Sequence, residues 1–493
     1  MDSLPILSLI IFTPVIGILL LMFLDRRYVQ ELRQVALVIS LVPLILSLWM
    51  LHMFQEGQGK MQLEEVHAWI PTLNIGYHLG IDGISVLLVL LTTFLTPVLL
   101  LSSWNSINKR IKEFQIAILL LEAAMIGVFL SLDLVLFYLF WEAMLIHMYI
   151  LIGVWGGERR VYAAIKFFIY TMVGSLLMFL AILYLWFQTG SFDLQVISSA
   201  LHGTAPLDAS QQCWLFAAFA LAFAIKVPLF PFHTWLPDAH VEAPTAGSVV
   251  LAGVLLKMGT YGFIRFAIPL FPLAVEVFYP WLCALSIIGI IFGAFMAWMQ
   301  TDIKKLVAYS SVSHLGFVML GIMVLNSNGL AGSVLQMINH GLSTSMLFLL
   351  VGIIYERRHT REVTQYGGLA KVMPVFSCFF MIATFSSIGL PGLNGFIGEF
   401  LILLGTFQKS VWLAVLAATG VILSAVYMLN LVKRFLLGPL DREENRQLND
   451  VTAREFCYLA PFVVLIVFIG LYPKPFLNLI EPTVGYLLAQ LAH

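Results

Sequence analysis

Long apolar runs separated by short polar gaps follow one another along the whole chain. A helix of about 20 apolar residues is long enough to cross a bilayer, and about 14 runs meet that criterion. They lie near residues 4–24, 34–54, 83–104, 114–132, 134–154, 162–188, 212–236, 244–269, 275–298, 304–325, 331–355, 372–402, 410–434 and 453–472. The pattern predicts an all-α polytopic membrane protein. The first run is expected to be an uncleaved span, because an acid precedes it and arginines follow it.

Lys and Arg gather in alternate gaps, and such residues mark cytoplasmic loops. Most of the 26 follow spans 1, 3, 5, 9, 11 and 13, namely Arg26, Arg27, Arg33, Lys109, Arg110, Lys112, Arg159, Arg160, Lys304, Lys305, Arg357, Arg358, Arg361, Lys371, Lys433, Arg434, Arg442, Arg446 and Arg454. The intervening gaps hold only Lys60, Lys409 and Lys474. The alternation keeps its phase from end to end. We therefore expect an even number of spans, with both termini on the outer side.

Two polar segments are too hydrophilic to span. Residues 55–82 are predicted to form a small external hairpin or loop, because they combine Gly, Pro and short alternating stretches. Residues 438–452, the longest charged stretch, are expected to be a cytoplasmic linker to a separate last helix.

Spans 7 and 12 are both interrupted, by KVPLFPFHTWLP (226–237) and SSIGLPGLNGFIGEF (386–400). Broken helices at matching positions in two halves of a transporter indicate inverted repeats. Spans 4–8 and 9–13 would then be two five-helix units of opposite orientation. The predicted divisions are spans 1–3 with the hairpin, two half-channels, and the linker with the last helix, at residues 1–113, 114–270, 271–437 and 438–493.

Composition excludes several functions. The chain is 60% hydrophobic and 11% charged, with a net charge of −1, and no basic patch suggests a nucleic acid partner. The cysteines Cys213, Cys283, Cys378 and Cys457 form no CxxC pair, so no metal or iron–sulfur site is expected. There is also no GxGxxG loop, Walker lysine or CxxCH motif. Energy for transport must therefore come from an ion gradient or from neighbouring subunits.

Ionisable residues inside the predicted spans are the main functional candidates, since charge at membrane depth is expensive. Lys226 precedes the break in span 7, and Lys257 lies within span 8. Lysine suits proton transfer because its pKa shifts readily on burial. Glu142 in span 5 and Glu399 in span 12 supply carboxylates. The alternative readings are structural ion pairs or a lysine that reaches the interface.

Histidines form a second set. His314 and His340 lie in adjacent spans beside Ser, Thr or Asn, which suggests a proton relay, although a lone buried histidine often has only a packing role. Glu122 and His233 are weaker candidates. A cluster of His233, Asp238, His240 and Glu242 favours the lining of a hydrated funnel over a metal site, because prolines disturb the ligand spacing.

Four stretches resemble the signature of the antiporter-like subunits of respiratory complex I. They are KVPLFPFHTWLPDAHVEAPTAGSVVLAGVLLKMGTYG, QTDIKKLVAYSSVSHLGFVMLG, FSSIGLPGLNGFIGEF and FWEAMLIHMYILIGVWG, at 226–262, 300–321, 385–400 and 140–156. The resemblance covers nearly the whole chain and includes the expected helix count. It implies a proton-translocating subunit in the bacterial cell (inner) membrane, within a translocating NADH:quinone oxidoreductase.

The resemblance also implies roles for residues. Glu142 matches the glutamate of helix 5, Lys226 the lysine of broken helix 7, Lys257 the connecting lysine of helix 8, and Glu399 the acid of broken helix 12. His314 and His340 match histidines of the hydrophilic axis. The family's L and N subunits usually carry lysine at the last position, so Glu399 argues against both. A long C-terminal lateral helix, expected of L, is also absent.

The implied mechanism takes protons from the cytoplasm to Lys226, along Lys257, His314 and His340, and out near Glu399, with a Glu142–Lys226 pair as the switch. NADH, FMN, iron–sulfur clusters and quinone would lie in partner subunits. The implied partners are L-, N- and K-like subunits, the lateral helix of the L-like one, and lipid. The alternatives are a multisubunit Na⁺/H⁺ antiporter, a related hydrogenase or photosynthetic complex, and a scaffold without transport.

Overall fold

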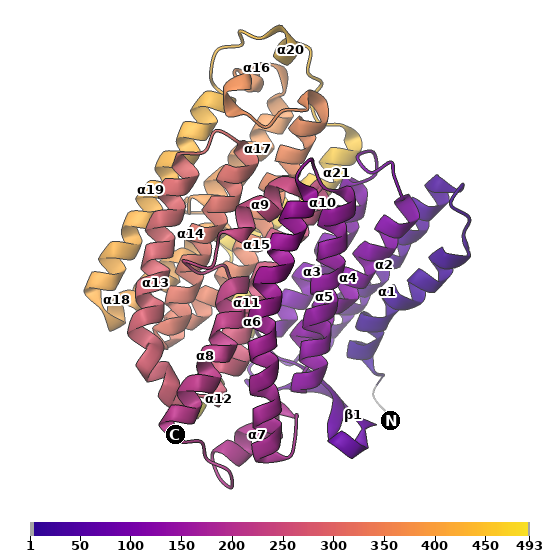
Figure 1. Ribbon diagram of the computed structural model, residues 1–493. Helices are drawn as coiled ribbons and strands as arrows, with labels where there is room; N and C mark the ends of the chain where they lie inside the picture. Colours follow the sequence, from indigo (N-terminus) through magenta and orange to yellow (C-terminus); the bar gives the residue numbers. More distant parts are fainter. Residues whose placement is uncertain (1–3, 492–493) are drawn as a thin grey trace.

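A computed structural model describes residues 4–491 as a bundle of helices, most of them running along one common direction (Figure 1). Within these residues, 12 helical segments are long and apolar enough to cross a membrane. They are α1 (Ile6–Phe23), α2 (Val29–Met53), α3 (Ser85–Ser102), α4 (Ile111–Leu130), α5 (Leu134–Trp155), α6 (Arg160–Thr189), the composite segment Thr245–Leu270, α13 (Pro272–Trp298), α14 (Ile303–Met323), α15 (Ser327–Arg358), α19 (Val411–Phe435) and α21 (Ala453–Leu471).

Two further spans are broken, as predicted. The first consists of α8 (Ala209–Lys226) and α9 (Trp235–Glu242), and the second of α17 (Pro374–Ser387) and α18 (Asn394–Lys409). The first break contains Pro228 and Pro231, which lack the N–H that would continue a helix. Gly389 and Gly392 in the second break adopt φ of 73° and 93°, which glycine tolerates better than other residues. The prediction of about 14 spans, with the seventh and twelfth discontinuous, is confirmed.

The composite span is interrupted by two π-helical turns. It consists of α10 (Thr245–Val250), the π-helix η2 (Leu251–Leu255), α11 (Leu256–Gly262), a second π-helix η3 (Phe263–Ala267) and α12 (Ile268–Leu270). π-helical turns are rare and are often found at functional sites. This span, α14 and α15 are the most enclosed: their apolar windows are 100%, 94% and 100% buried, against 33% for α2 and α19. The centre of the bundle is therefore made by the helices that carry Lys257, His314 and His340.

Residues 55–82 contain the expected hairpin, made of antiparallel strands β1 (Gln62–Ile70) and β2 (Ile75–Ile81). β1, α7 (Leu194–Leu201), α12 and the start of α1 lie at the lower end of the bundle (Figure 1), as does the end of the last described helix. The short helices α16 (Leu369–Val372) and α20 (Glu443–Arg446) lie at the opposite end (Figure 1), and the 3₁₀ helix η4 (Val363–Gln365) precedes α16 in the chain. Placement of the first and last described residues at one end agrees with an even number of spans.

Two features differ from the sequence-based expectation. A further helix, α22 (Lys474–Leu491), follows the last span, and only one of its faces is buried, which gives it no long apolar run. Lys304 was expected in a loop, but it lies in the first turn of α14, is 7% exposed and donates to the Ala243 carbonyl at 2.7 Å. Its side chain therefore contacts the backbone at the end of α9 instead of reaching solvent.

A line of buried polar side chains at the centre of the bundle

Four of the predicted residues form one chain of contacts across four helices. Lys257 Nζ on α11 lies 2.7 Å from His340 Nδ1 on α15. The rings of His340 and His314, which is on α14, are 5.8 Å apart between centroids. His314 Nδ1 lies 2.9 Å from Glu399 Oε1 on α18. None of the four is more than 4% exposed, so the line is shielded from both lipid and solvent.

The π-helical turn η2 gives Lys257 its second contact. Its Nζ also donates to the Ala252 carbonyl, inside η2. A π-turn disturbs the regular hydrogen-bond ladder, and such sites are where side chains insert into it. The lysine is thereby held between its own helix and His340. No carboxylate lies within 4.0 Å of its Nζ among the described residues.

The second helix break shapes the other end of the line. Glu399 Oε1 accepts from Gln336 Nε2 at 3.2 Å as well as from His314. Ser387 Oγ, at the end of α17, lies 3.2 Å from His314 Nε2. With Nδ1 donating to the carboxylate, Nε2 is free to accept from the serine hydroxyl. The break places Ser387 and Glu399 on two sides of the same imidazole.

Lys226 ends α8 in an apolar and aromatic pocket. It is 1% exposed, its Nζ lies 3.6 Å from Met144 Sδ, and the Trp141 ring centroid is 5.1 Å away. A cation over an aromatic face gains attraction from the ring quadrupole. Within residues 4–491 no Glu142–Lys226 ion pair closer than 4.0 Å is present, so the expected direct pair is not formed in this conformation.

Glu142 nevertheless lies at the level of the lysine. Trp141 and Met144, which contact Lys226, flank Glu142 on α5. Glu142 itself is half-buried, and its Oε1 has no hydrogen-bond partner within the described part of the chain. This oxygen of the carboxylate is therefore available to Lys226.

Lys226 and Lys257 lie on helices that touch. A side chain at Gly259 would come within 2.7 Å of the Phe223 carbonyl and 2.9 Å of the Val227 nitrogen. Small residues permit this close approach of α11 to the end of α8. In the described residues no direct hydrogen bond joins the two lysines. The four-residue line thus begins next to Lys226 but does not include it.

The remaining candidates are dispersed. Glu122 on α4 is 0% exposed, and neither of its carboxylate oxygens has a partner among residues 4–491. His233 is buried and stacks on Phe230 at 5.6 Å. Asp238 binds Lys166 at 2.7 Å. No group of three potential metal ligands occurs in the part of the chain that the structure describes.

A hydrated lining does not describe His240. Its ring is 0% exposed and stacks on Phe348 at 4.5 Å, and neither ring nitrogen has a partner within residues 4–491. Glu242 instead accepts from the Arg159 backbone N–H at 3.0 Å and caps the loop before α6. His240 therefore contacts Phe348, whereas Glu242 contacts Arg159, and the two side chains do not share one site.

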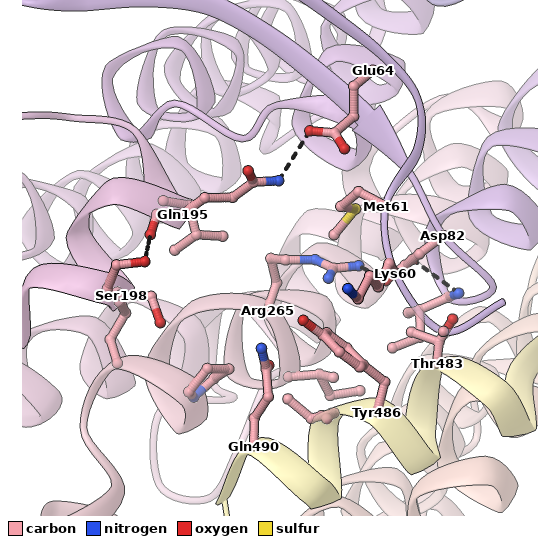
Figure 2. A pocket seen from close by; sticks show the side chains of 18 residues that line it. Lys60, Met61, Glu64, Asp82, Gln195, Ser198, Arg265, Thr483, Tyr486 and Gln490 are labelled. Carbon is pink, nitrogen blue, oxygen red and sulfur yellow. Dashed lines mark hydrogen bonds and ion pairs between the residues drawn. The ribbon is translucent and has the colours of Figure 1, made fainter. Parts of the chain in front are cut away.

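One buried pair was missed by the sequence reasoning. Arg265 on η3 forms an ion pair with Asp82, which is 1% exposed and follows β2 (Figure 2). Arg265 falls within the predicted span at residues 244–269, and no partner was assigned to it. The only sequence signal for a partner was the acid Asp82, which lies at the junction of the hairpin and α3 and is 183 residues away in sequence.

Comparison with known proteins identifies the family. The profile described as "NADH:quinone oxidoreductase/Mrp antiporter, TM" matches residues 131–424, and "NADH-ubiquinone oxidoreductase chain 4, amino terminus" matches residues 60–132. The chain is 46% identical over 494 residues to NADH-quinone oxidoreductase subunit M of Rhodobacter capsulatus, covering 98% of this chain and 96% of that protein.

The chain belongs to the subunit M (chain 4) family of respiratory complex I. The family extends to plants: NADH-ubiquinone oxidoreductase chain 4 of Arabidopsis thaliana is 46% identical over 482 residues, covering 98% of this chain and 96% of that protein. A chain of the structure entitled "Respiratory complex I from Thermus thermophilus with bound NADH" superposes with a TM-score of 0.89 at 31% identity, covering 98% of this chain and 99% of that one.

Membership in the subunit M family decides the main question of function. The protein is a multi-pass, proton-translocating, antiporter-like subunit of complex I, a translocating NADH:quinone oxidoreductase, and it works with the other subunits of that complex. The full-length relatives are subunits of that enzyme, which sets aside the antiporter, hydrogenase and scaffold alternatives.

Proposed function

We propose that protons cross this subunit along Lys257, His340, His314 and Glu399, with Lys226 loading the line. The supporting observation is a succession of buried polar groups, with contacts of 2.7 Å between Lys257 and His340 and 2.9 Å between His314 and Glu399. Proton transfer requires heavy atoms within about 2.6–3.2 Å, or one bridging water. Both nitrogen–nitrogen and nitrogen–oxygen steps fall inside that range.

Each group suits its place in the line. Lys257 as ammonium donates to His340 Nδ1, and transfer of that proton leaves a neutral amine and an imidazolium. Imidazole takes and returns a proton near neutral pH, so His340 can pass it toward His314. The two rings are 5.8 Å apart, a gap that one water molecule can bridge. His314 then delivers the proton from Nδ1 to the Glu399 carboxylate.

Lys226 and Glu142 act as the switch in this proposal. Burial of Lys226 against Met144 and Trp141 removes water from the amine, and this cost to the charged form opposes the attraction of the Trp141 ring. A change in side-chain conformation that brings Glu142 to the lysine favours the ammonium instead. Making and breaking the pair would therefore alternate proton uptake by Lys226 with release toward Lys257.

The two five-helix units, residues 114–270 and 271–437, serve as half-channels in the proposal. Lys226 lies in the first and Glu399 in the second, and the line crosses between them.

Protons enter from the cytoplasm and leave on the outer side, where both termini lie, in a bacterial inner membrane. An alkaline phosphatase joined to the C-terminus should be active in cells, because that enzyme requires an oxidising compartment. An inactive fusion would reverse the orientation.

The proposed neighbours are the L-, N- and K-like subunits and the lateral helix of the L-like subunit. NADH, FMN, iron–sulfur clusters and quinone are proposed to be bound by partner subunits. Electron transfer there would drive the Lys226 switch through the membrane arm.

The test uses Lys257→Met in the assembled complex within inverted membrane vesicles. NADH oxidation and acidification of the vesicle interior are measured in parallel. We expect proton uptake per NADH to fall, because methionine keeps the volume but carries no proton. Lys257→Arg should also fail, since arginine does not release its proton.

Lys409→Met is the matched control, because Lys409 is exposed near the end of α18. Its proton uptake should equal that of the unmodified complex. Normal pumping by both Lys257 variants would remove this lysine from the path.

A further inference from the structure

A surface pocket of about 420 Å³ opens at the end of the bundle that carries the hairpin and α22. Lys60 and Glu64 lie on its hairpin side, Gln195 and Ser198 on its α7 side, and Tyr486 and Gln490 on α22 (Figure 2). It holds far more than one water molecule, whose share of liquid volume is about 30 Å³. Arg265 and Asp82 both line it.

The Asp82–Arg265 pair closes the inner side of this pocket. Asp82 Oδ1 accepts the N–H groups of Ile84 and Ser85, at 3.1 and 3.0 Å, and is thereby fixed at the start of α3. Its Oδ2 is left for Arg265 Nη2. Arg265 Nε donates to Tyr261 Oη at 3.2 Å, and Tyr261 donates in turn to the Phe129 carbonyl at 2.9 Å. The guanidinium therefore ties Asp82 to Tyr261.

Aromatic rings continue the closure beyond the ion pair. Phe129 packs edge-on to Tyr261 at 5.3 Å, and Phe266 lies 6.3 Å from the same ring. Tyr261 is 1% exposed. Closely packed rings leave little space for water beside the ion pair.

Lys257 lies one helical turn from Tyr261 in the same span. Lys257 and Tyr261 are four residues apart in α11 and lie on one side of the helix. Arg265, in the π-helical turn η3, reaches Tyr261 through its Nε. At about 1.5 Å per residue, eight residues separate Lys257 from Arg265 by about 12 Å. A hydrated pocket thus ends only a few turns from the line of buried polar groups.

We propose that Asp82, Arg265 and Tyr261 form a seal that prevents protons from passing between this pocket and Lys257. The inference rests on the proposed proton line. Without the seal, a chain of water molecules could join the outer surface to Lys257 and let protons run back. The three residues are therefore positioning residues that keep transport coupled, and they carry no proton in the forward direction.

The test measures passive proton flow without electron transfer. Purified complex is reconstituted into liposomes, and a pH jump of the external buffer imposes a pH difference. Equal K⁺ on both sides with valinomycin holds the membrane potential at zero, and an enclosed pH dye follows the decay of the pH difference in the absence of NADH. Asp82→Asn retains the oxygen that caps α3 but turns an N–H₂ group toward Arg265, which opens the pair. We expect faster decay than in the unmodified complex.

Two comparisons make the result specific. Glu443→Gln removes an exposed carboxylate from an ion pair on the opposite end of the bundle, and its decay should equal that of the unmodified complex. The double variant Asp82→Asn with Lys257→Met should lose the leak, because the route then lacks its first buried acceptor. A leak that persists in the double variant would place the route elsewhere and overturn the inference.

An assembled Asp82→Asn complex with unchanged decay would also overturn it. Should Asp82→Asn fail to assemble, Arg265→Lys carries the same test, since one ammonium cannot bridge Asp82 and Tyr261 in the guanidinium geometry. The proposed function is tested separately by NADH-driven pumping of Lys257→Met alone. Failure of that proposal and failure of the seal thus appear in different measurements.

Discussion

His314→Ala should interrupt proton movement between the two halves of the subunit. His314 is the only one of the four line residues that is in hydrogen-bond contact with Glu399, at 2.9 Å. Alanine removes the ring that stands between His340 and this carboxylate. Glu399 then retains Gln336 as a partner, which donates but does not relay protons.

The magnitude follows from the lost hydrogen bond. A hydrogen bond to a charged group contributes about 1.5–3 kcal/mol. Because each 1.36 kcal/mol of barrier is a factor of ten in rate, loss of that stabilisation slows transfer into Glu399 by about 10- to 100-fold. NADH-driven acidification should fall accordingly in inverted vesicles, while assembly of the complex is retained.

The control is His202→Ala, since His202 is an exposed histidine at the end of α7. Its proton uptake per NADH should not change. NADH oxidation is also measured with an uncoupler, which separates a transport defect from loss of electron transfer. Full proton uptake per NADH in His314→Ala would refute the relay reasoning for this residue.

Two further predictions concern the end of the bundle that carries the hairpin. Burial lowers the pKa of His78, but hydrogen bonds to Asp193 and Glu64 outweigh it and raise the pKa above its usual value. The stabilisation by protonated His78 is then complete below about pH 6.5 and is lost as pH rises through the raised pKa. Hydrogen exchange in β2, corrected for intrinsic rates, should therefore speed up with pH in the unmodified protein but not in His78→Gln. An unchanged pH dependence in that variant would exclude the His78 contacts as the cause. Gly83→Ala should destabilise the docking of α22 by about 1–3 kcal/mol, because the added Cβ would lie 1.8 Å from the Leu479 carbonyl oxygen. Limited proteolysis of α22 checks this, and Gly485→Ala on α22 is the control, since nothing lies within 4 Å of its Cβ position. Equal cleavage of the two variants would contradict the prediction.

The span count and the broken helices were predictable because they depend on local properties. A bilayer requires about 20 apolar residues per helix, whatever the neighbouring helices are. Pro228 and Pro231 lack the N–H needed to continue a helix at any position. The positions of α22 and Lys304 were not predictable in this way, because an amphipathic helix and a buried lysine depend on what packs against them.

The sequence by itself determined which groups are costly at membrane depth: Lys226, Lys257, His314, His340 and Glu399 were all selected from single apolar runs. Only the tertiary structure decided which of them meet. It brought the last four into one line, left Lys226 against Trp141 and Met144 rather than paired with Glu142, and joined Arg265 to Asp82 across 183 residues. The physical reason is that burial cost is a property of each residue in its run, whereas hydrogen bonds of about 3 Å depend on helix packing.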